Sequence, residues 1–381
     1  MRHAITILGQ LLSLLPAYQF DSFVGQHAAD KYTKTMSCWQ QLAVMLYAQA
    51  SGKDSLRDIE TGLSVHAEKL YHLGIESVAR STLADANAHR PAAIFESLFY
   101  ALLKRVQGLS PEKQFSFPNP LRVIDSTTIT LCLTLFPWAT YRTRKGALKL
   151  HYDFNVTEQL PEFVVHTDGN ASDIKTIKES GMTVIPDSIY AVDRAYIDWK
   201  WLYEEIHLNG AYFVVRAKTT TMFTVLEDLP AGEGGIISDQ RIMLSSDNAV
   251  RLVTYYDEKK KKALQFITNN FDLSAKTIAD AYKARWEIEL FFKWIKQNLK
   301  IRTFLGTSEN AVMIQVWVAM IYYLLVAYIK KQTKIACSML ELTRMIAATL
   351  MDRVHLVDIL ALRVNKLHQL QIRDGPQLAL F

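Results

Sequence analysis

Three carboxylates stand at places in the chain where they could act together on one substrate. Asp125 and Asp193 each directly follow a pair of apolar residues in strand-like sequence, and Glu289 lies in a helical stretch among basic and aromatic residues. Buried aspartates need a partner, and a divalent cation stabilises several of them at once. Oxygen-only ligands favour Mg²⁺ or Mn²⁺ over zinc, and a pair of such ions can cleave a phosphodiester bond. For each aspartate alone, a turn or helix-cap position is the alternative interpretation.

Glu289 belongs to the polar face of a helix predicted over 282–300. With a helical rotation of about 100° per residue, six polar side chains of this stretch fall within roughly 80° of one another. Apolar residues take the opposite side, so we expect one amphipathic helix whose polar face points outward. Two interpretations of this face stay open: a metal ligand flanked by cations that hold phosphates, or surface ion pairs worth about 0.2–0.5 kcal/mol each. The six residues are Tyr282, Arg285, Glu289, Lys293, Lys296 and Lys300.

The elements that would position these residues begin with a helical region. Residues 1–106 show the three-to-four spacing of apolar residues that predicts helices, and they contain no strand pattern. The polar and proline-rich segment 107–120 follows, and we interpret it as the linker to a second domain. The expected helices are 37–50, 55–62, 77–89 and 92–106, several of them with a serine at the start.

After the linker the pattern changes to that of strands. Three strands, a helix and a fourth strand, in this order, are typical of a ribonuclease H-like mixed sheet, although other α/β arrangements share the pattern. Residues 211–270 are again rich in strands and predict a β insertion, and from residue 274 onward the pattern is helical. We therefore predict a ribonuclease H-like domain over 121–330 and a C-terminal helical region over 331–381. The expected core elements are strands over 122–130, 148–156, 162–167 and 188–192, with a helix over 171–179.

Composition limits the classes of protein to which the chain can belong. Of its 381 residues, 50% are hydrophobic, which is enough for two or more domains with substantial cores. The net charge of +5 is small, so any affinity for nucleic acid must come from local clusters of basic residues. Three widely spaced cysteines indicate buried thiols in a reducing compartment, so we expect a cytoplasmic protein. The apolar segment 1–16 lacks a signal-peptide cleavage site, and we interpret 311–329 as a helix in a large core and not as a membrane span.

The spacing of Tyr282, Arg285, Glu289 and Lys296 matches, position for position, the YREK signature of bacterial insertion-sequence transposases, and the chain resembles that family. These enzymes carry an Asp, Asp, Glu triad on a ribonuclease H-like fold. The N-terminal helical region also resembles an accessory domain found in one branch of the family. Further segments that resemble the family are Asp125-Ser126-Thr127, Asp193-Arg194-Ala195-Tyr196, Lys145-Gly146-Ala147 with Lys149 and His151, and the β insertion.

The resemblance implies a function and a catalytic site. Asp125, Asp193 and Glu289 would be the catalytic residues and would hold Mg²⁺, two ions in number, with Mn²⁺ as a substitute. The enzyme would cleave transposon ends by hydrolysis and join them to target DNA by transesterification, in a cut-and-paste reaction. Its partners would be double-stranded DNA, as inverted-repeat ends and as target, and a second copy in a homodimer, with no membrane. A non-transposing nuclease of the same fold and an inactive DNA-end-binding regulator are the alternatives.

The same resemblance names the expected DNA contacts. Residues of the helix around Glu289 would hold phosphates, and Trp286 would stack on a displaced base, with a place at the edge of the core as the equal alternative. The polar positions of 77–90, and not the resemblance, make this segment a candidate recognition helix, so the N-terminal domain, 1–106, is the candidate for binding the DNA ends. The expected contacts are Tyr282, Arg285, Trp286, Lys296, Arg194 and Lys145 in the second domain, and Arg80, Ser81, Thr82, Asn87 and Arg90 in the first.

Overall fold

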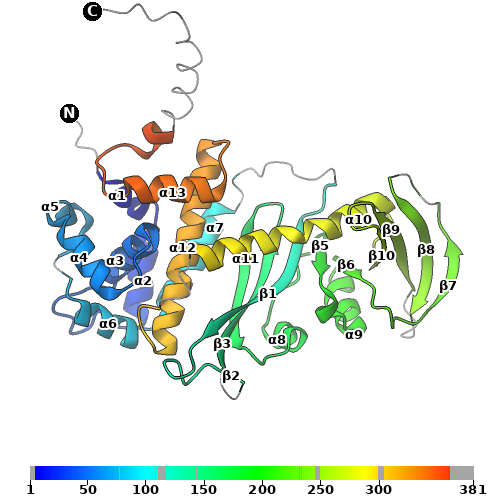
Figure 1. Cartoon of the computed structure of the whole chain (residues 1–381), viewed down its shortest axis with the longest axis horizontal. Helices are drawn as coiled ribbons and strands as arrows, with labels where there is room; N and C mark the ends of the chain where they lie inside the picture. Colours follow the sequence, from blue (N-terminus) through cyan, green and yellow to red (C-terminus); the bar gives the residue numbers. More distant parts are fainter. Residues whose placement is uncertain are drawn as a thin grey trace, which may run out of the picture. The chain divides into compact units, whose positions relative to one another are not determined.

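The computed structural model describes residues 5–76, 78–107, 109, 117–142, 145–230, 232, 234–244, 249–298 and 304–360. These residues belong to two units: a helical unit, Met1–Ser110 with Gln297–Phe381, and a sheet unit, Pro111–Lys296 (Figure 1). Most of the predicted linker, 107–120, lies outside the described residues, as does 361–381 of the predicted C-terminal region.

The helical unit draws its helices from both ends of the chain. The spacing of apolar residues predicts four of them, and the structure confirms all four with slightly shifted ends. The serine before α3 shows why this helix begins where it does. Ser37 Oγ accepts from the N–H of Gln40, and the Gln40 side chain accepts from the N–H of Ser37, which is a capping box. The helices are α1 (Ile7–Ser13), α2 (Ala17–Gln26), α3 (Cys38–Ser51), α4 (Leu56–Ser64), α5 (Ala67–Leu70), η1 (Tyr71–Leu73), α6 (Arg80–His89), α7 (Ala92–Val106), α12 (Glu309–Thr333) and α13 (Met339–Thr349).

Helix α12 is the central element of this unit. It packs on α3, α6, α7 and α13, and its residues from Ala311 to Val326 are buried on all sides. Among the described residues it is the one helix long and apolar enough to cross a membrane, and 94% of its apolar window lies inside the protein. A helix that other helices surround needs apolar residues all round. The prediction of a core helix over 311–329 is therefore confirmed.

The position of α12 also divides the chain differently from the predicted domains. The predicted ribonuclease H-like domain, 121–330, ends inside α12, whereas the structure places the described residues from Gln297 onward in the helical unit. The physical reason is the long-range contact of α12 with α3 and α7, which no local pattern in the sequence reports.

The sheet unit contains a ten-stranded mixed sheet whose core has the ribonuclease H-like order. β1, β3 and β4 form an antiparallel meander, and β5 and β6 follow on the other side of β1, parallel to it. The predicted order of three strands, a helix and a strand is confirmed. Strands and helices are β1 (Leu121–Leu131), β2 (Thr140–Arg142), β3 (Lys145–Asn155), β4 (Leu160–Asp168), α8 (Asp173–Glu179), β5 (Ile189–Val192), η2 (Arg194–Tyr196), α9 (Trp199–Trp201), η3 (Leu202–His207), β6 (Tyr212–Arg216), β7 (Phe223–Asp228), β8 (Ile236–Leu244), β9 (Ala249–Asp257), β10 (Lys262–Thr268), α10 (Ala275–Ala284) and α11 (Trp286–Asn298).

The segment 211–270 contains a core strand as well as the insertion. β6 pairs parallel with β5, with Tyr212 beside Ile189, and is therefore the fifth strand of the core. β10 then pairs antiparallel with β6 and continues the sheet through β9 and β8 to β7. The insertion proper runs over β7 to β10. The predicted start of the insertion, residue 211, is earlier than its start in the structure. The sequence of β6 is rich in apolar residues, and such a strand can belong either to the buried core or to an insertion.

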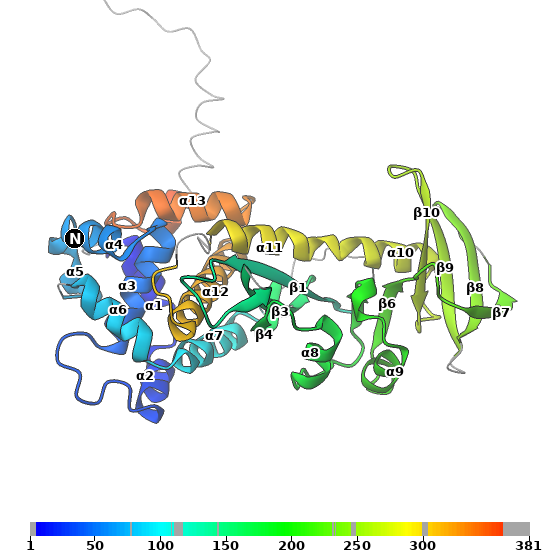
Figure 2. The same ribbon diagram turned by 60° about the horizontal axis from the view of Figure 1, so that its bottom comes forward.

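Helices cover both faces of the core sheet (Figure 2). α8 and α9 lie on one face, and α10 and α11 lie on the other. On the second face, the ring of Phe291 lies 5.2 Å from that of Tyr152 and 4.8 Å from that of Phe154, both on β3. Side chains alternate along a strand, so consecutive residues of β1 meet helices on opposite faces.

The predicted helix over 282–300 is two helices in the structure. α10 ends at Ala284 and α11 begins at Trp286. Arg285 lies between them with φ −51° and ψ −28°. Its N–H donates to the carbonyl of Tyr282, and its carbonyl accepts from Ile288, each at 3.2 Å, so these bonds span three residues and tighten the helix at this point. Lys300, the last residue of the predicted polar face, lies outside the described residues.

The three cysteines are free thiols. Cys38 and Cys337 are buried, as expected, whereas the expectation is wrong for Cys132, which is exposed just after β1. A hydrogen bond with Thr134 lowers the pKa of the Cys132 thiol, while burial raises that of Cys38 to about 12.

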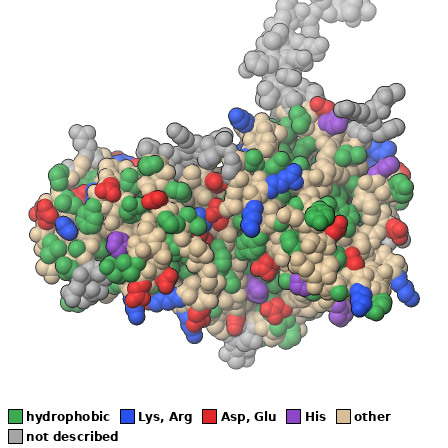
Figure 3. Space-filling view, turned by 180° about the vertical axis from the view of Figure 1, so that it is seen from behind, with side chains coloured by type: hydrophobic (Ala, Val, Ile, Leu, Met, Phe, Trp, Pro, Cys, Tyr) green, Lys and Arg blue, Asp and Glu red, His purple; other side chains and the backbone are tan. Residues whose placement is uncertain are grey.

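Charged side chains of both signs are mixed on one face of the protein. On the face shown in Figure 3, Lys and Arg lie in small groups among acidic and apolar side chains. This distribution agrees with the small net charge of +5 and leaves nucleic-acid affinity to local clusters.

Candidate active site

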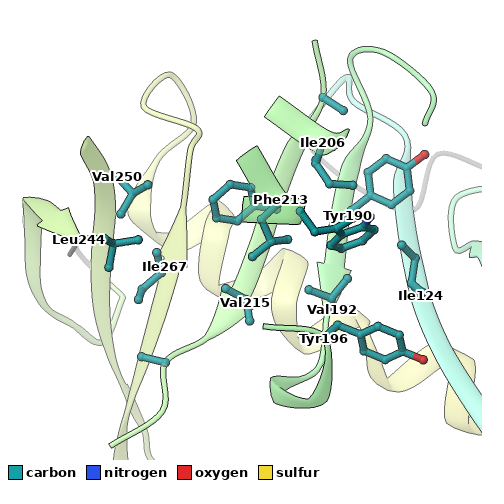
Figure 4. Close-up of a cluster of buried hydrophobic side chains, with 14 of the residues drawn as sticks. Ile124, Tyr190, Val192, Tyr196, Ile206, Phe213, Val215, Leu244, Val250 and Ile267 are labelled. Atoms are coloured by element: carbon teal, nitrogen blue, oxygen red, sulfur yellow. The ribbon is translucent and has the colours of Figure 1, made fainter. Parts of the chain in front are cut away.

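Asp125 and Asp193 lie at the same edge of the core sheet. β1 and β5 are parallel neighbours in which Ile124 lies beside Val192, and the next residue of each chain segment is an aspartate. Ile124 and Val192 point into an apolar cluster on the α8 side of the sheet (Figure 4). Alternation along β1 therefore turns Asp125 toward the face that α10 and α11 cover. Its Oδ1 accepts a hydrogen bond from the N–H of Ser126 at 2.8 Å.

Arg285, between α10 and α11, connects a strand carboxylate with a helix carboxylate. Its Nη1 donates to Oδ2 of Asp125 at 2.8 Å and lies 3.9 Å from Oε1 of Glu289. The side chains of Arg285 and Asp125 are 14% and 16% exposed, and that of Glu289 is 42% exposed. The expectation that the polar face of 282–300 points outward is therefore wrong at Arg285, which turns inward to the sheet.

The charges of the three carboxylates influence the pKa values of Asp125 and Arg285. Burial raises the pKa of Asp125 to about 6; the N–H of Ser126 and the guanidinium of Arg285 oppose this rise, and the charges of Glu289 and Asp193 add to it. Burial alone would lower the pKa of Arg285, but Asp125, and after it Tyr282, Asp193 and Glu289, raise it. One guanidinium thus lies in the combined field of three carboxylates.

The donor chemistry of these carboxylates fits a divalent cation. All are oxygen donors of the kind that Mg²⁺ and Mn²⁺ take, and a cationic group already lies among them. Among the described residues, no three His, Cys, Asp or Glu side chains have the mutual spacing of a metal site. Carboxylates repel one another, and here Arg285 lies between Asp125 and Glu289. The charge and chemistry of the three carboxylates suit a metal, while Asp125 and Glu289 are at present spaced as ion-pair partners of Arg285.

The expected DNA contacts near Arg285 differ in exposure. Trp286 is 62% exposed, so the alternative of a place at the edge of the core is wrong. Lys296 is exposed toward the end of α11. Tyr282 is half-buried, with its ring 4.7 Å from that of Phe266 on β10. Trp286 and Lys296 are available to a large ligand without any rearrangement of the core.

For Arg194 and Lys145, the two expected DNA contacts near the sheet, the structure gives less information about the side chains. Arg194 follows Asp193 directly, and its N–H donates to Oδ1 of that residue at 2.6 Å. The Arg194 side chain is partly exposed, and its Nε is buried without a hydrogen-bond partner among the described residues. Lys145 begins β3, and its side chain lies outside what the structure describes.

The candidate recognition helix contributes two of its expected contacts to the fold instead. Asn87 is 1% exposed and accepts from Nε2 of Gln41 at 2.8 Å. Arg90 donates to Oε1 of the same glutamine at 3.1 Å. Assigning them to base reading is therefore wrong, because both connect α6 to α3. Arg80 and Ser81 are exposed at the start of α6.

Sequence reasoning missed Asp173, the first residue of α8. Its Oδ1 accepts from Oγ of Ser126 at 2.6 Å and lies 2.9 Å from Nζ of Lys149. An aspartate at a helix start is common, so nothing local marks it. Only its partners could have pointed to Asp173 in the sequence, since Ser126 and Lys149 both stand in segments that resemble the family.

Comparison with known proteins agrees with this fold. Residues 116–325 match the family model described as a transposase DDE domain, and residues 3–76 match a domain of unknown function, DUF4372. Over 291 residues the chain is 33% identical to a putative transposase of Sinorhizobium fredii, covering 73% of this chain and 79% of that protein. Over 264 residues it is 31% identical to a probable transposase for insertion sequence element IS5377 of Geobacillus stearothermophilus, covering 64% and 69%.

A third relative, a putative transposase for insertion sequence element IS4SA of Synechocystis, is 26% identical over 305 residues, covering 77% of this chain and 86% of that protein. The DDE model spans more than half of the chain, and it includes both sheet aspartates and the helix that carries Glu289. The chain therefore belongs to the DDE transposases, enzymes that cleave DNA and transfer its strands.

Proposed function

We propose that this transposase cleaves the DNA ends of its own insertion sequence and joins them to target DNA by a cut-and-paste route. The observation that supports this most is that Arg285 bonds Asp125 and lies 3.9 Å from Glu289, while Asp193 directly follows the parallel strand next to that of Asp125. Two relatives carry names that describe them as transposases for insertion sequence elements, which supports the same class of substrate.

Asp125, Asp193 and Glu289 would hold Mg²⁺, in a pair of ions. Such a pair activates the attacking oxygen and stabilises the leaving oxygen of a phosphodiester. Hydrolysis of an end and later attack by the freed 3′ hydroxyl on target DNA are the same displacement at phosphorus, so one site serves both steps. No covalent bond between enzyme and DNA is required.

Residues of the two helices would hold the substrate. Arg285 is largely buried, so a hydrogen bond from its guanidinium to a phosphate oxygen would be weakly screened. Lys296 lies about 16 Å farther along the helix axis, which suits a second phosphate of the same strand. Trp286, next to Arg285 and exposed, would stack on a displaced base.

The reaction also implies partners. Two ends must be cut together, so we propose a homodimer that holds two double-stranded ends and the target. Substrate DNA of this kind is cytoplasmic in a bacterium. The apolar helix α12 is buried in the helical unit, and so it gives no reason to place the protein in a membrane.

A direct test uses the purified chain, DNA carrying the inverted repeats that flank its gene, and Mg²⁺. Changing a residue that only supports a metal ligand costs about 10–100-fold in activity, so Asp193→Asn, which alters a ligand, should lower end cleavage more than about 100-fold. Binding of the ends without Mg²⁺ should stay within a factor of about two, because the phosphate contacts remain.

Asp187→Asn is the matched control. Asp187 is exposed in the turn at the other end of β5 and has φ +58°, a conformation that Asn tolerates well, so this variant should cleave like the wild type. Continued cleavage by Asp193→Asn would refute the site. Cleavage of DNA without inverted repeats and without strand joining would indicate a nuclease, and binding with no Mg²⁺-dependent product would indicate a regulator.

A further inference from the structure

Two consecutive residues of β1 are held from opposite faces of the sheet. Asp125 meets Arg285 of the helix pair on one face, at 2.8 Å. Ser126 points to the other face, where its Oγ donates to Oδ1 of Asp173 at 2.6 Å. Because α8 supplies Asp173, the strand is fixed at the catalytic aspartate by helices on both sides.

Asp173 is itself held in place by residues of β3. Nζ of Lys149 lies 2.9 Å from the same Oδ1 and also donates to the carbonyl of Ala171 at 3.1 Å. Nδ1 of His151 lies 3.5 Å from this oxygen, and its Nε2 is 2.9 Å from Oγ1 of Thr167. His151 is fully buried, and Lys149 and Asp173 are 13% and 21% exposed. A surface ion pair is mobile, whereas this cluster is largely buried and has two donors, Oγ of Ser126 and Nζ of Lys149, at 2.6 and 2.9 Å from one oxygen.

The charges of this cluster and of the catalytic carboxylates both influence the hydroxyl of Tyr196. The residue is 1% exposed. Burial, and after it the negative charges of Asp173, Asp125 and Asp193, raise the pKa of its hydroxyl. Both sheet aspartates of the site and Asp173 therefore act on one hydroxyl group.

We propose that Asp173 is a positioning residue for catalysis, which acts on Asp125 through Ser126. The N–H of Ser126 donates to Oδ1 of Asp125, so the orientation of the Ser126 peptide sets the orientation of that carboxylate. Holding the Ser126 side chain prevents β1 from twisting at this point. The inference rests on the proposed function, because it assumes that the carboxylate of Asp125 holds Mg²⁺.

The test measures end cleavage by the full chain over a range of Mg²⁺ concentrations. Asp173→Ala should raise the half-saturating Mg²⁺ concentration or lower the maximal rate by about 10–100-fold, as is usual when the support of a ligand is removed. Binding of end DNA without Mg²⁺ should stay within a factor of about two. Asp173→Asn keeps an oxygen that accepts from Ser126 and Lys149, and it should restore cleavage to within a few-fold of the wild type.

Ser126→Ala provides a second route that does not depend on how Asp173→Ala folds. It should cause a loss similar to that of Asp173→Ala, and the double variant should lose no more than either alone, because both act through one bond. Asp168→Ala, at an exposed aspartate that ends β4, is the control and should behave as the wild type.

Wild-type Mg²⁺ dependence in a folded Asp173→Ala or Ser126→Ala protein would overturn the proposal. So would an Asn variant as impaired as the Ala variant, or additive losses in the double variant. Failure of the proposed function would look different, because the wild type itself would then give no Mg²⁺-dependent cleavage, or Asp193→Asn would still cleave.

Discussion

At the scale of single residues, Arg285 joins parts of the chain that are far apart in sequence. It bonds Asp125, 160 residues earlier, and lies within 3.9 Å of Glu289 one turn later on the helix. The four-residue signature predicts that this arginine contacts DNA phosphates, and the structure shows it among carboxylates. Both roles need a cation held near anionic oxygens, so one position of the guanidinium suits both.

Trp286 offers a test of DNA recognition at one residue. Because its side chain is 62% exposed, Trp286→Ala should change the free energy of unfolding by less than about 0.5 kcal/mol. Loss of stacking should weaken binding of a displaced base by about 1–3 kcal/mol. Fluorescence of 2-aminopurine placed at the cleaved end would report the stacking, with Trp286→Phe retaining part of it.

Leu290→Ala is the matched control for Trp286, since Leu290 is one turn farther along α11 and 51% exposed. It removes exposed apolar area without an indole ring and should leave the fluorescence unchanged. Equal quenching of 2-aminopurine by the wild type and by Trp286→Ala would contradict the stacking role.

At the scale of elements, β3 contains a fully buried histidine, His151. Burial lowers the pKa of His151 from 6.5 to about 4; Asp173 of α8 opposes this change, and Lys149 on the same strand adds to it. The unfolded chain takes up this proton near pH 6.5 and the folded protein only near pH 4. Stability should therefore fall as the pH falls between these values, by a total on the order of 3 kcal/mol.

The measurement is urea unfolding at pH 7 and pH 5 for the wild type and His151→Gln. Between these values the variant should lose about 2 kcal/mol less stability than the wild type. Asp125 titrates in the same range with the opposite sign, so the difference between the two proteins isolates His151. His166→Gln, at an exposed residue of β4, is the control. Identical pH dependence in His151→Gln would contradict the prediction.

The elements also show how far local patterns carry a prediction. Strands β3 and β4 follow from their apolar alternation, β1 from its β-branched residues and β5 from a short apolar run, because all three patterns are local properties of the sequence. The break between α10 and α11 at Arg285 could not be predicted in this way. The apolar spacing of the sequence continues through Arg285 as it would in one unbroken helix. Nor could the place of β6, whose apolar residues fit a core or an insertion equally well, be predicted from its pattern.

At the scale of the whole molecule, the helical unit joins segments from the early and the late part of the chain. The N–H groups of Ile7 and Leu8 donate to the carbonyls of Asp352 and Leu350, at 3.1 and 2.9 Å. Helix α12, from the later part of the chain, packs on α3 and α7 from the earlier part. The unit cannot complete its core until the sheet unit between these segments has been synthesised.

A substitution at Asn310 tests how much the contacts between the early and late segments stabilise the helical unit. Its Oδ1 accepts from the N–H of Ala92 at 3.0 Å, and its Nδ2 donates to the carbonyls of Asn87 and Arg90 at 3.0 and 2.7 Å. Asn310→Ala leaves these part-buried groups without a partner and should lower the free energy of unfolding by about 2–4 kcal/mol. Urea denaturation measures this loss.

Gln332→Ala, at an exposed position near the end of α12, is the control and should change stability by less than about 0.5 kcal/mol. An Asn310→Ala protein as stable as this control would show that the bonds of Asn310 contribute nothing to the closure of the unit.

The sequence by itself determined the periods of its strands and helices, the spacing of Tyr282, Arg285, Glu289 and Lys296, and the apolar character of α12. These are local properties, set by which side of each element is buried. Only the tertiary structure decided that Arg285 meets Asp125, that Asn87 and Arg90 serve the fold, and that Asp173 lies behind Ser126. Each of these pairs joins residues 46 or more positions apart. Such contacts depend on how whole elements pack, and no local spacing encodes that.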